Sequence, residues 1–155
     1  MMYCLRLYLI LLKMTNWDKK FIKLAREIST WSKDPSTKHG TVIVDDRHNI
    51  ISTGYNGPPR GVDDSKVPTT RPEKYNWFCH SEANALISAG RLGRSTENCT
   101  IYQTGPSCPY CWLLIANSGI KRQVRGNLSS HCVSEEDIKV QTEMAKQIGI
   151  EIVNI

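Results

Sequence analysis

This 155-residue sequence lacks three features that would place it in specialised classes of protein. No apolar run reaches the roughly 20 residues that a membrane-spanning helix needs, so we expect no membrane span. Six cysteines are too few, in a chain of this length, for a disulfide scaffold. The sequence also contains no internal repeat and no low-complexity segment. With 40% hydrophobic residues, it predicts one domain with an ordinary core.

The excess of positive charge is small, at a formal +5. Such a charge suits an anionic substrate and would also suit nucleic acid, but it is more often a property of a solvated surface. The net charge therefore does not distinguish between a small anionic substrate and nucleic acid as the partner.

The first residues of the chain, MMYCLRLYLILLKM, are largely apolar. They show neither the basic start nor the small-residue cleavage site of a signal peptide. Met14 is followed at once by Thr15-Asn16-Trp17-Asp18, a favourable helix start. We therefore predict that residues 1–13 are an N-terminal extension, that Met14 is the working initiator, and that residues 14–155 form a single domain.

Hydrophobic periodicity predicts an alternation of helices and strands. The predicted helices cover residues 17–32, 80–89, 108–117 and 137–147, and the predicted strands cover 40–44, 50–55, 99–103, 120–124 and 150–153. The first two strands form a β-hairpin. Residues 62–76 are a long polar connection, and this pattern is typical of a lid or binding loop and also of a disordered segment. The pattern predicts one α/β sheet with helices on its faces.

The stretch with the clearest chemistry runs from Cys79 to Cys111. It begins Cys79-His80-Ser81-Glu82 and ends Pro106-Ser107-Cys108-Pro109-Tyr110-Cys111. Zn²⁺ takes nitrogen and sulfur ligands in a tetrahedron, and a catalytic zinc site leaves the fourth position to water. His80, Cys108 and Cys111 supply three such ligands. Cys79 points away from its neighbour His80 and is interpreted as a small buried apolar residue.

Glu82 lies two residues after His80. If a helix begins at Ser81, the Glu82 carboxylate leans over the metal without binding it, and it can move a proton between water and substrate. The order H-x-E then C-x-x-C is a signature of the zinc nucleobase deaminases. A structural zinc site would want a fourth ligand, and a redox dithiol would leave His80 and Glu82 unexplained.

From about residue 33 to residue 124, the chain resembles the deoxycytidylate (dCMP) deaminases of cells and bacteriophages. The resemblance rests on Ser32-Lys33-Asp34-Pro35, on Gly54-Tyr55-Asn56-Gly57-Pro58-Pro59-Arg60-Gly61, and on the two halves of the zinc motif. The Gly-Tyr-Asn-Gly segment points to dCMP deaminases within the wider superfamily. Two positions depart from the usual pattern, because Ser107 stands in the place of a proline and Ser81 in the place of an alanine.

The resemblance implies an α/β fold of the cytidine-deaminase-like type, with three α/β/α layers around a central mixed five-stranded sheet. It implies that His80, Cys108 and Cys111 bind Zn²⁺ and that Glu82 shuttles a proton. It also implies that Asn56 contacts the deoxyribose and that the backbone N–H near Ser81 lies beside the pyrimidine.

The implied reaction is the hydrolysis of dCMP to dUMP and ammonia, which supplies a thymidylate precursor. Many members are hexamers that dCTP activates and dTTP inhibits, with Mg²⁺. The segment that resembles their effector site contains Gly57, Pro58, Arg60, Asp63 and Asp64. Because thiolate ligands must stay reduced, we expect a cytoplasmic protein, in the host cytoplasm if it is viral.

Several alternatives stay open. A deaminase of cytosine or adenine in a polynucleotide would need a basic and aromatic track for the strand. Aromatic residues do flank the site, but core packing explains them more simply; they are Trp77, Phe78, Tyr110 and Trp112. A deaminase of free cytidine, of guanine or of a modified cytosine nucleotide, and a zinc-folded module without catalysis, are further alternatives. Candidates for holding a substrate phosphate are Lys38, Arg60, Lys121, Arg122 and Arg125.

Overall fold

The computed structural model describes residues 14–155. Its elements in chain order are α2 (Asn16–Ser29), β1 (Gly40–Val44), β2 (Ile50–Tyr55), the short 3₁₀ helices η1 (Asp64–Lys66) and η2 (Glu73–Asn76), α3 (Ser81–Arg91), β3 (Thr100–Gln103), α4 (Pro109–Ala116), β4 (Arg122–Arg125), α5 (Glu135–Ile148) and β5 (Glu151–Asn154). The predicted extension, residues 1–13, lies outside the described residues. Within the described part of the chain, no helix is long and apolar enough to cross a bilayer.

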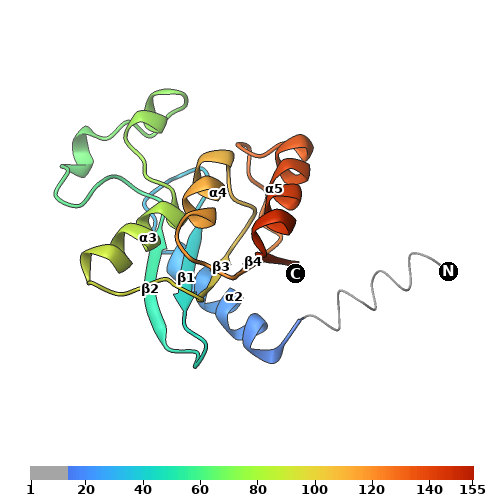
Figure 1. The fold of residues 1–155 in the computed structure, drawn as a ribbon. Helices are drawn as coiled ribbons and strands as arrows, with labels where there is room; N and C mark the ends of the chain where they lie inside the picture. Colours follow the sequence, from blue (N-terminus) through green and yellow to red (C-terminus); the bar gives the residue numbers. More distant parts are fainter. Residues whose placement is uncertain (1–13) are drawn as a thin grey trace.

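The strands form one mixed sheet of five strands in the order β2-β1-β3-β4-β5 (Figure 1). Strand β1 is antiparallel to both β2 and β3, whereas β3, β4 and β5 run parallel. Parallel neighbours need a crossover connection, and α4 and α5 provide the two that occur here. The predicted hairpin and the predicted mixed five-stranded sheet are confirmed.

Helices cover both faces of the sheet, so the core has two halves (Figure 1). Successive side chains of a strand point to opposite faces. In β1, Val42 and Val44 therefore pack against α2, while Ile43 packs among residues of α3, α4 and α5. The result is the three-layer α/β/α arrangement that was expected.

The first helix differs in detail from its prediction. A capping box between Thr15 and Asp18 starts α2, which ends at Ser29 rather than at residue 32. Trp17 is 42% exposed, and its ring stacks on that of His48 with the ring centroids 4.4 Å apart. Asp18 is buried instead, and it accepts hydrogen bonds from the Tyr102 hydroxyl and the Arg122 guanidinium. The buried Asp18 therefore adds polar contacts between α2 and the sheet to the apolar contacts of the same helix.

The first turn of α3 lies directly on β2. A Cβ atom added to Gly54 would stand 2.3 Å from the backbone oxygen of Ser81 and 2.5 Å from the backbone nitrogen of Ala85. No larger residue fits this approach without a backbone shift. Gly54 thus allows the start of α3 to sit close to the sheet.

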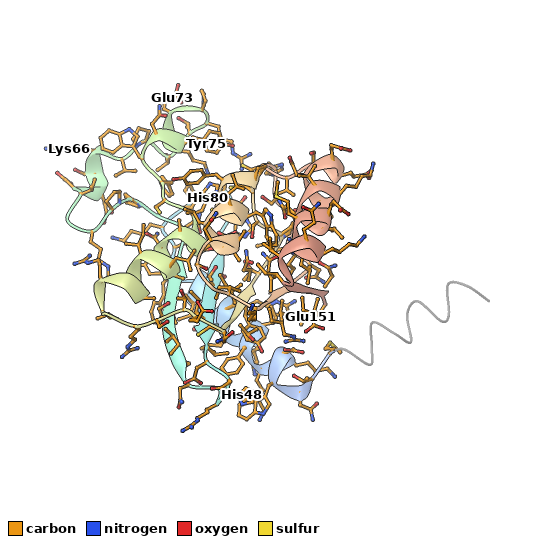
Figure 2. All side chains as sticks on the ribbon, viewed as in Figure 1. His48, Lys66, Glu73, Tyr75, His80 and Glu151 are labelled. Atoms are coloured by element: carbon orange, nitrogen blue, oxygen red, sulfur yellow. The ribbon has the colours of Figure 1, made fainter. Side chains whose placement is uncertain are left out.

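The chain between β2 and α3, residues 56–80, forms a long loop at one end of the molecule, here called the excursion (Figure 1). A backbone pair closes its base, with N–O distances of 3.0 and 2.8 Å between Gly57 and Cys79. Figure 2 shows Lys66 and Glu73 at its outer end and His80 near its base. Residues 62–76 are therefore an ordered loop that contains η1 and η2.

Candidate active site

Three side chains placed to hold a metal meet where two helices begin. His80 is the N-cap residue of α3, Cys108 is the N-cap residue of α4, and Cys111 lies in the first turn of α4. The Nδ1 atom of His80 lies 3.3 Å from Sγ of Cys108 and 3.5 Å from Sγ of Cys111. Tetrahedral zinc, with bonds of about 2.3 Å to sulfur and 2.0 Å to nitrogen, places such atoms about 3.5 Å apart. The predicted ligand set therefore fits zinc in both chemistry and spacing.

Local hydrogen bonds prepare the cysteines for a metal. The side chain and the backbone N–H of Cys111 both hydrogen-bond to the sulfur of Cys108, and with His80 they lower the pKa of Cys108 to about 4. The shared hydrogen bond raises the pKa of Cys111 correspondingly. A helix N-terminus also favours a thiolate. Both effects favour the thiolate form of Cys108, which is the form in which a cysteine binds zinc.

Glu82 is the second residue of α3 and is only 7% exposed. Its Oε2 atom accepts a hydrogen bond of 3.0 Å from the Ser81 hydroxyl, and its Oε1 atom accepts one of 2.9 Å from the Gln103 side-chain amide. Burial raises the pKa of this carboxyl above its ordinary value. A carboxyl with a raised pKa is better matched to proton transfer near neutral pH.

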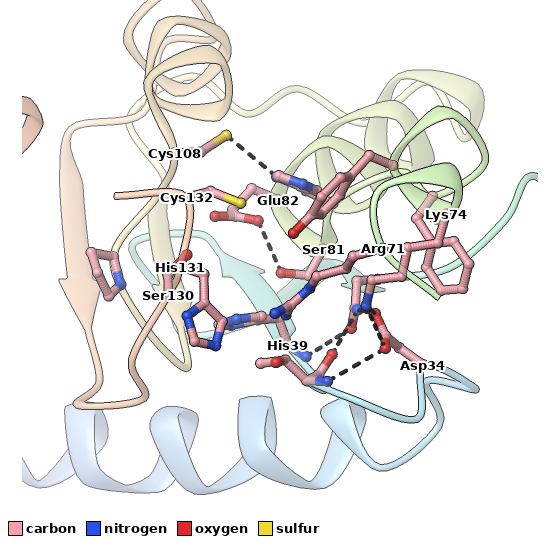
Figure 3. A pocket seen from close by; sticks show the side chains of 16 residues that line it. Asp34, His39, Arg71, Lys74, Ser81, Glu82, Cys108, Ser130, His131 and Cys132 are labelled. Atoms are coloured by element: carbon pink, nitrogen blue, oxygen red, sulfur yellow. Dashed lines mark hydrogen bonds and ion pairs between the residues drawn. The ribbon is translucent and has the colours of Figure 1, made fainter. Parts of the chain in front are cut away.

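A pocket opens beside these residues (Figure 3). Figure 3 shows Glu82 and Cys108 together on one side and Asp34 and Lys74 together on another. The lining comes from five separate parts of the chain, namely residues 34–39, Asn56, residues 71–82, residues 106–108 and residues 130–132. The long polar connection thus lines the pocket, through Arg71, Lys74 and Tyr75.

Asn56 and Ser81, the predicted substrate-binding residues, both line the pocket. The side chain of Asn56 is largely engaged within the protein. Its Oδ1 atom accepts a hydrogen bond of 2.7 Å from the backbone N–H of His39, and its Nδ2 atom donates to Asp34 and to the Thr37 carbonyl. The structure therefore places Asn56 as a fixed part of the pocket wall.

The predicted effector residues, Gly57, Pro58, Arg60, Asp63 and Asp64, do not line this pocket. They lie in the first part of the excursion. There the carboxylate of Asp63 caps η1, and that of Asp64 pairs with Lys33.

None of the five cations that we considered for a substrate phosphate lines the pocket. Arg122 pairs with Asp18 of α2 and with Glu151 of the neighbouring strand β5, and Arg125 is buried on the opposite face of the sheet. The side chains at the pocket that can donate hydrogen bonds to an anion instead include Arg71, Lys74 and His131. Two of these lie in the long polar connection, whereas His131 carries no signal in the sequence.

Comparison with known proteins identifies the family in which this combination of metal-binding residues and Glu82 belongs. The family model described as "Cytidine and deoxycytidylate deaminase zinc-binding region" matches residues 15–127. The chain belongs to this family. The cofactor of the deaminase is therefore Zn²⁺, as predicted, and His80, Cys108 and Cys111 are placed to hold it.

Relatives of the deaminase include proteins of bacteria and animals. An uncharacterized deaminase of Aliivibrio fischeri is 38% identical over 141 residues, which cover 89% of this chain and 92% of that protein. The human deoxycytidylate deaminase is 32% identical over 115 residues, which cover 70% of this chain and 64% of the human protein. The match thus spans nearly all of the bacterial relative but under two thirds of the human one.

The solved structures confirm the fold. The dCMP deaminase of cyanophage S-TIM5, in complex with dCMP and dUMP, superposes with a TM-score of 0.71 at 24% identity. The match covers 92% of this chain and 99% of the phage chain. The predicted cytidine-deaminase-like fold is therefore correct.

Proposed function

We propose that this deaminase hydrolyses dCMP to dUMP and ammonia. The observation that carries the proposal is one pocket lined by three kinds of group. These are the side chains placed to hold the metal, the buried Glu82, and the guanidinium of Arg71 with the imidazole of His131. A nucleoside monophosphate needs all three, because its base must reach the metal while its phosphate needs cationic partners. The human relative, named deoxycytidylate deaminase, supports the same substrate.

The proposed chemistry assigns the proton transfers to Glu82. Zinc, when bound, supplies a Lewis acid that lowers the pKa of water. Glu82 takes the proton of the attacking water and delivers it to N3 of cytosine, which makes C4 more electrophilic. After the C4–O bond has formed, Glu82 takes the remaining proton from the new C4 hydroxyl and passes it to the amino group, and the C4–N bond breaks to release ammonia as the C4 carbonyl forms.

The remaining residues orient the substrate. In this proposal Asn56 faces the deoxyribose and the backbone at Ser81 faces the pyrimidine, as the family resemblance implies. Arg71 and His131 hold the 5′-phosphate. Lys74 contributes less to the phosphate, because its ammonium group already pairs with Asp34.

A substrate panel tests the proposal. The panel contains dCMP, CMP, deoxycytidine, dCTP and a single-stranded oligonucleotide, each with the wild type and with Glu82→Gln. We expect turnover of dCMP alone, and its loss in the variant by roughly 10²- to 10⁴-fold. Glu27→Gln, an exposed change on α2, serves as the matched control. Turnover of the oligonucleotide would instead identify a polynucleotide deaminase, and wild-type activity in Glu82→Gln would refute the role of Glu82.

Regulation by nucleotides is a further part of the proposal. The exposed residues Arg60, Asp63 and Asp64 offer charged groups for a triphosphate with Mg²⁺. If dCTP activates and dTTP inhibits, each must change the saturation curve for dCMP. Unchanged curves at millimolar effector would place this chain among the unregulated deaminases.

Self-association is also proposed, with a hexamer as the expected state. Apolar side chains on α3 and α4 support it, because Ile87, Tyr110 and Leu113 are 55%, 69% and 48% exposed. A contiguous apolar surface of this kind favours contact with another protein surface. Light scattering during size-exclusion chromatography measures the mass directly. A cytoplasmic location, where thiolates stay reduced, completes the proposal.

A further inference from the structure

A group of buried polar side chains lies behind Glu82 and has no part in the chemistry described above. Its members are Gln103, Ser107, Gln123, Arg125 and Gln141, and none is more than 2% exposed. They come from β3, from the connection to α4, from β4 and from α5. The interior faces of parallel strands are normally apolar. Five polar side chains at this place therefore need an explanation.

Hydrogen bonds connect these side chains in one direction, starting from Arg125. A guanidinium can only donate hydrogen bonds. Its Nε atom donates to Oε1 of Gln123 at 2.8 Å, so the amide nitrogen of Gln123 must face the other way. That nitrogen donates to Oε1 of Gln103 and, at 2.8 Å, to Oγ of Ser107.

The same reasoning fixes the amide of Gln103. Because its Oε1 atom accepts from Gln123, its Nε2 atom faces Glu82 at 2.9 Å and Ser107 at 2.7 Å. Both N–H groups of this amide are then used. A donor therefore reaches the carboxylate of Glu82, and the orientation of that donor depends on Arg125, two amides away.

Arg125 is itself held firmly. Its Nη2 atom donates to Oε1 of Gln141 at 2.8 Å, and its guanidinium lies 5.6 Å from the ring centre of Trp112. Burial lowers the pKa of Arg125 to about 10, so the side chain still carries its charge at neutral pH. Among the described residues, its hydrogen-bond partners are neutral amides. A buried cation without a carboxylate partner is costly, which argues that it has a role.

The other oxygen of Glu82 is held from the opposite side. The Thr41 hydroxyl donates to Ser81 at 2.9 Å, and the Ser81 hydroxyl then donates to Oε2 of Glu82 at 3.0 Å. With Gln103 on Oε1, the carboxylate is fixed at both oxygens. Displacement of a reacting group by about 1 Å can cost about 10²-fold in rate.

We propose that Arg125, Gln123 and Gln103 form a positioning relay that holds the Glu82 carboxylate in its working orientation. Ser107 is the branch point of the relay, because its hydroxyl accepts from both glutamines. The relay gives a reason for the serine at this place, since a proline could not supply that acceptor. The residues of the relay do not touch the substrate, so they act through Glu82.

The test rests on the proposed function and measures kcat and KM for dCMP separately. Gln103→Met keeps the approximate length of the side chain and removes the donor. We expect kcat to fall roughly 10- to 100-fold, as for the loss of a hydrogen bond to a charged group. We expect KM to change less than about twofold and zinc content to stay complete, because neither the pocket lining nor the metal ligands are altered.

A double-mutant cycle then tests the connection. Arg125→Met should lower kcat by a smaller factor than Gln103→Met, and Arg125→Lys should recover part of that loss. If Arg125 acts through Gln103, the double variant should be no slower than Gln103→Met alone. Full additivity of the two losses, or an unchanged kcat in Gln103→Met, would overturn the relay.

Tyr102→Phe is the matched control. Tyr102 precedes Gln103 in β3, faces α2, and donates a buried hydrogen bond to a carboxylate, that of Asp18. It should lower stability and leave kcat unchanged. A comparable fall of kcat in this control would show that the fall in Gln103→Met comes from general destabilisation and not from the relay.

A second readout does not depend on activity. In ¹⁵N NMR spectra, Arg125→Met should shift the side-chain amide signals of Gln103, and Tyr102→Phe should not. Unshifted Gln103 signals would refute the relay. If the wild type does not deaminate dCMP, the proposed function fails, and the NMR experiment still decides whether the relay exists.

Discussion

The buried ion pair between Lys74 and Asp34 should hold the excursion and the pocket together, and Lys74→Met tests this. The two side chains are 4% and 5% exposed, and Nζ of Lys74 lies 2.9 and 2.8 Å from the two carboxylate oxygens of Asp34. The same carboxylate accepts from the backbone N–H of Ser36 and from the side chain of Asn56. Removal of Lys74 therefore leaves a buried carboxylate without its cation.

The expected loss is large. Breaking a buried ion pair from one side costs about 3 to 5 kcal/mol, because the remaining charge is uncompensated. We expect Lys74→Met to lower the free energy of unfolding by that amount at pH 7, measured by urea denaturation. Lys74→Met combined with Asp34→Asn removes both charges and should recover part of the loss.

The stabilisation by the Lys74–Asp34 pair should decrease as the pH is lowered. Burial acts to raise the pKa of Asp34, but hydrogen bonds from Lys74 and Ser36 outweigh it and hold the pKa below the ordinary 3.8. A carboxyl whose pKa is lower in the folded than in the unfolded protein stabilises the fold at pH values above its ordinary pKa. This stabilisation is lost as the pH falls through the pKa of the folded state. The difference between wild type and variant should therefore be complete at neutral pH and shrink below about pH 3.8.

An exposed lysine of the same loop provides the control. Lys66 lies 3.7 Å from Asp63, and both side chains are more than half exposed. Lys66→Met should cause no measurable change, because exposed pairs contribute little. If Lys74→Met costs less than about 1 kcal/mol, the pair behaves as a solvated one and does not hold the loop against the pocket.

Three further predictions follow from the site and from the face of the sheet that packs on α2. Cys108→Ser should lose zinc in elemental analysis, whereas Cys99→Ser, a buried change outside the cluster, should retain it; full zinc in the former would remove Cys108 from the ligand set. Arg71→Ala should raise KM for dCMP about 10-fold, as for one lost charged hydrogen bond, and leave KM for deoxycytidine unchanged. Asp18→Asn breaks the buried pair with Arg122 and should lower the free energy of unfolding by about 3 kcal/mol at pH 7. Burial acts to raise the pKa of Asp18, but the hydrogen bonds from Arg122, Thr15 and Tyr102 together hold it below the ordinary 3.8. This loss should therefore shrink below about pH 3.8, and a constant loss in acid would contradict the assignment.

Local patterns in the sequence were enough to predict the elements and the metal cluster. Strand alternation and turn residues predicted the hairpin with its observed bounds, 40–44 and 50–55. The spacing between His80 and Glu82, and that between Cys108 and Cys111, predicted the cluster because each half lies within one helical turn. Such features depend on residues close together in the chain, so sequence determines them directly.

Tertiary structure alone decided which polar residues meet. Arg122 and Arg125 were equal candidates for the phosphate, yet an odd separation in one strand sends them to opposite faces, where each finds different partners. Arg71 and His131 come together from segments about 60 residues apart. Gln103 reaches Glu82 only because folding brings the end of β3 close to the start of α3. The role of a polar side chain depends on the partners that folding brings to it, and those partners are distant in the sequence.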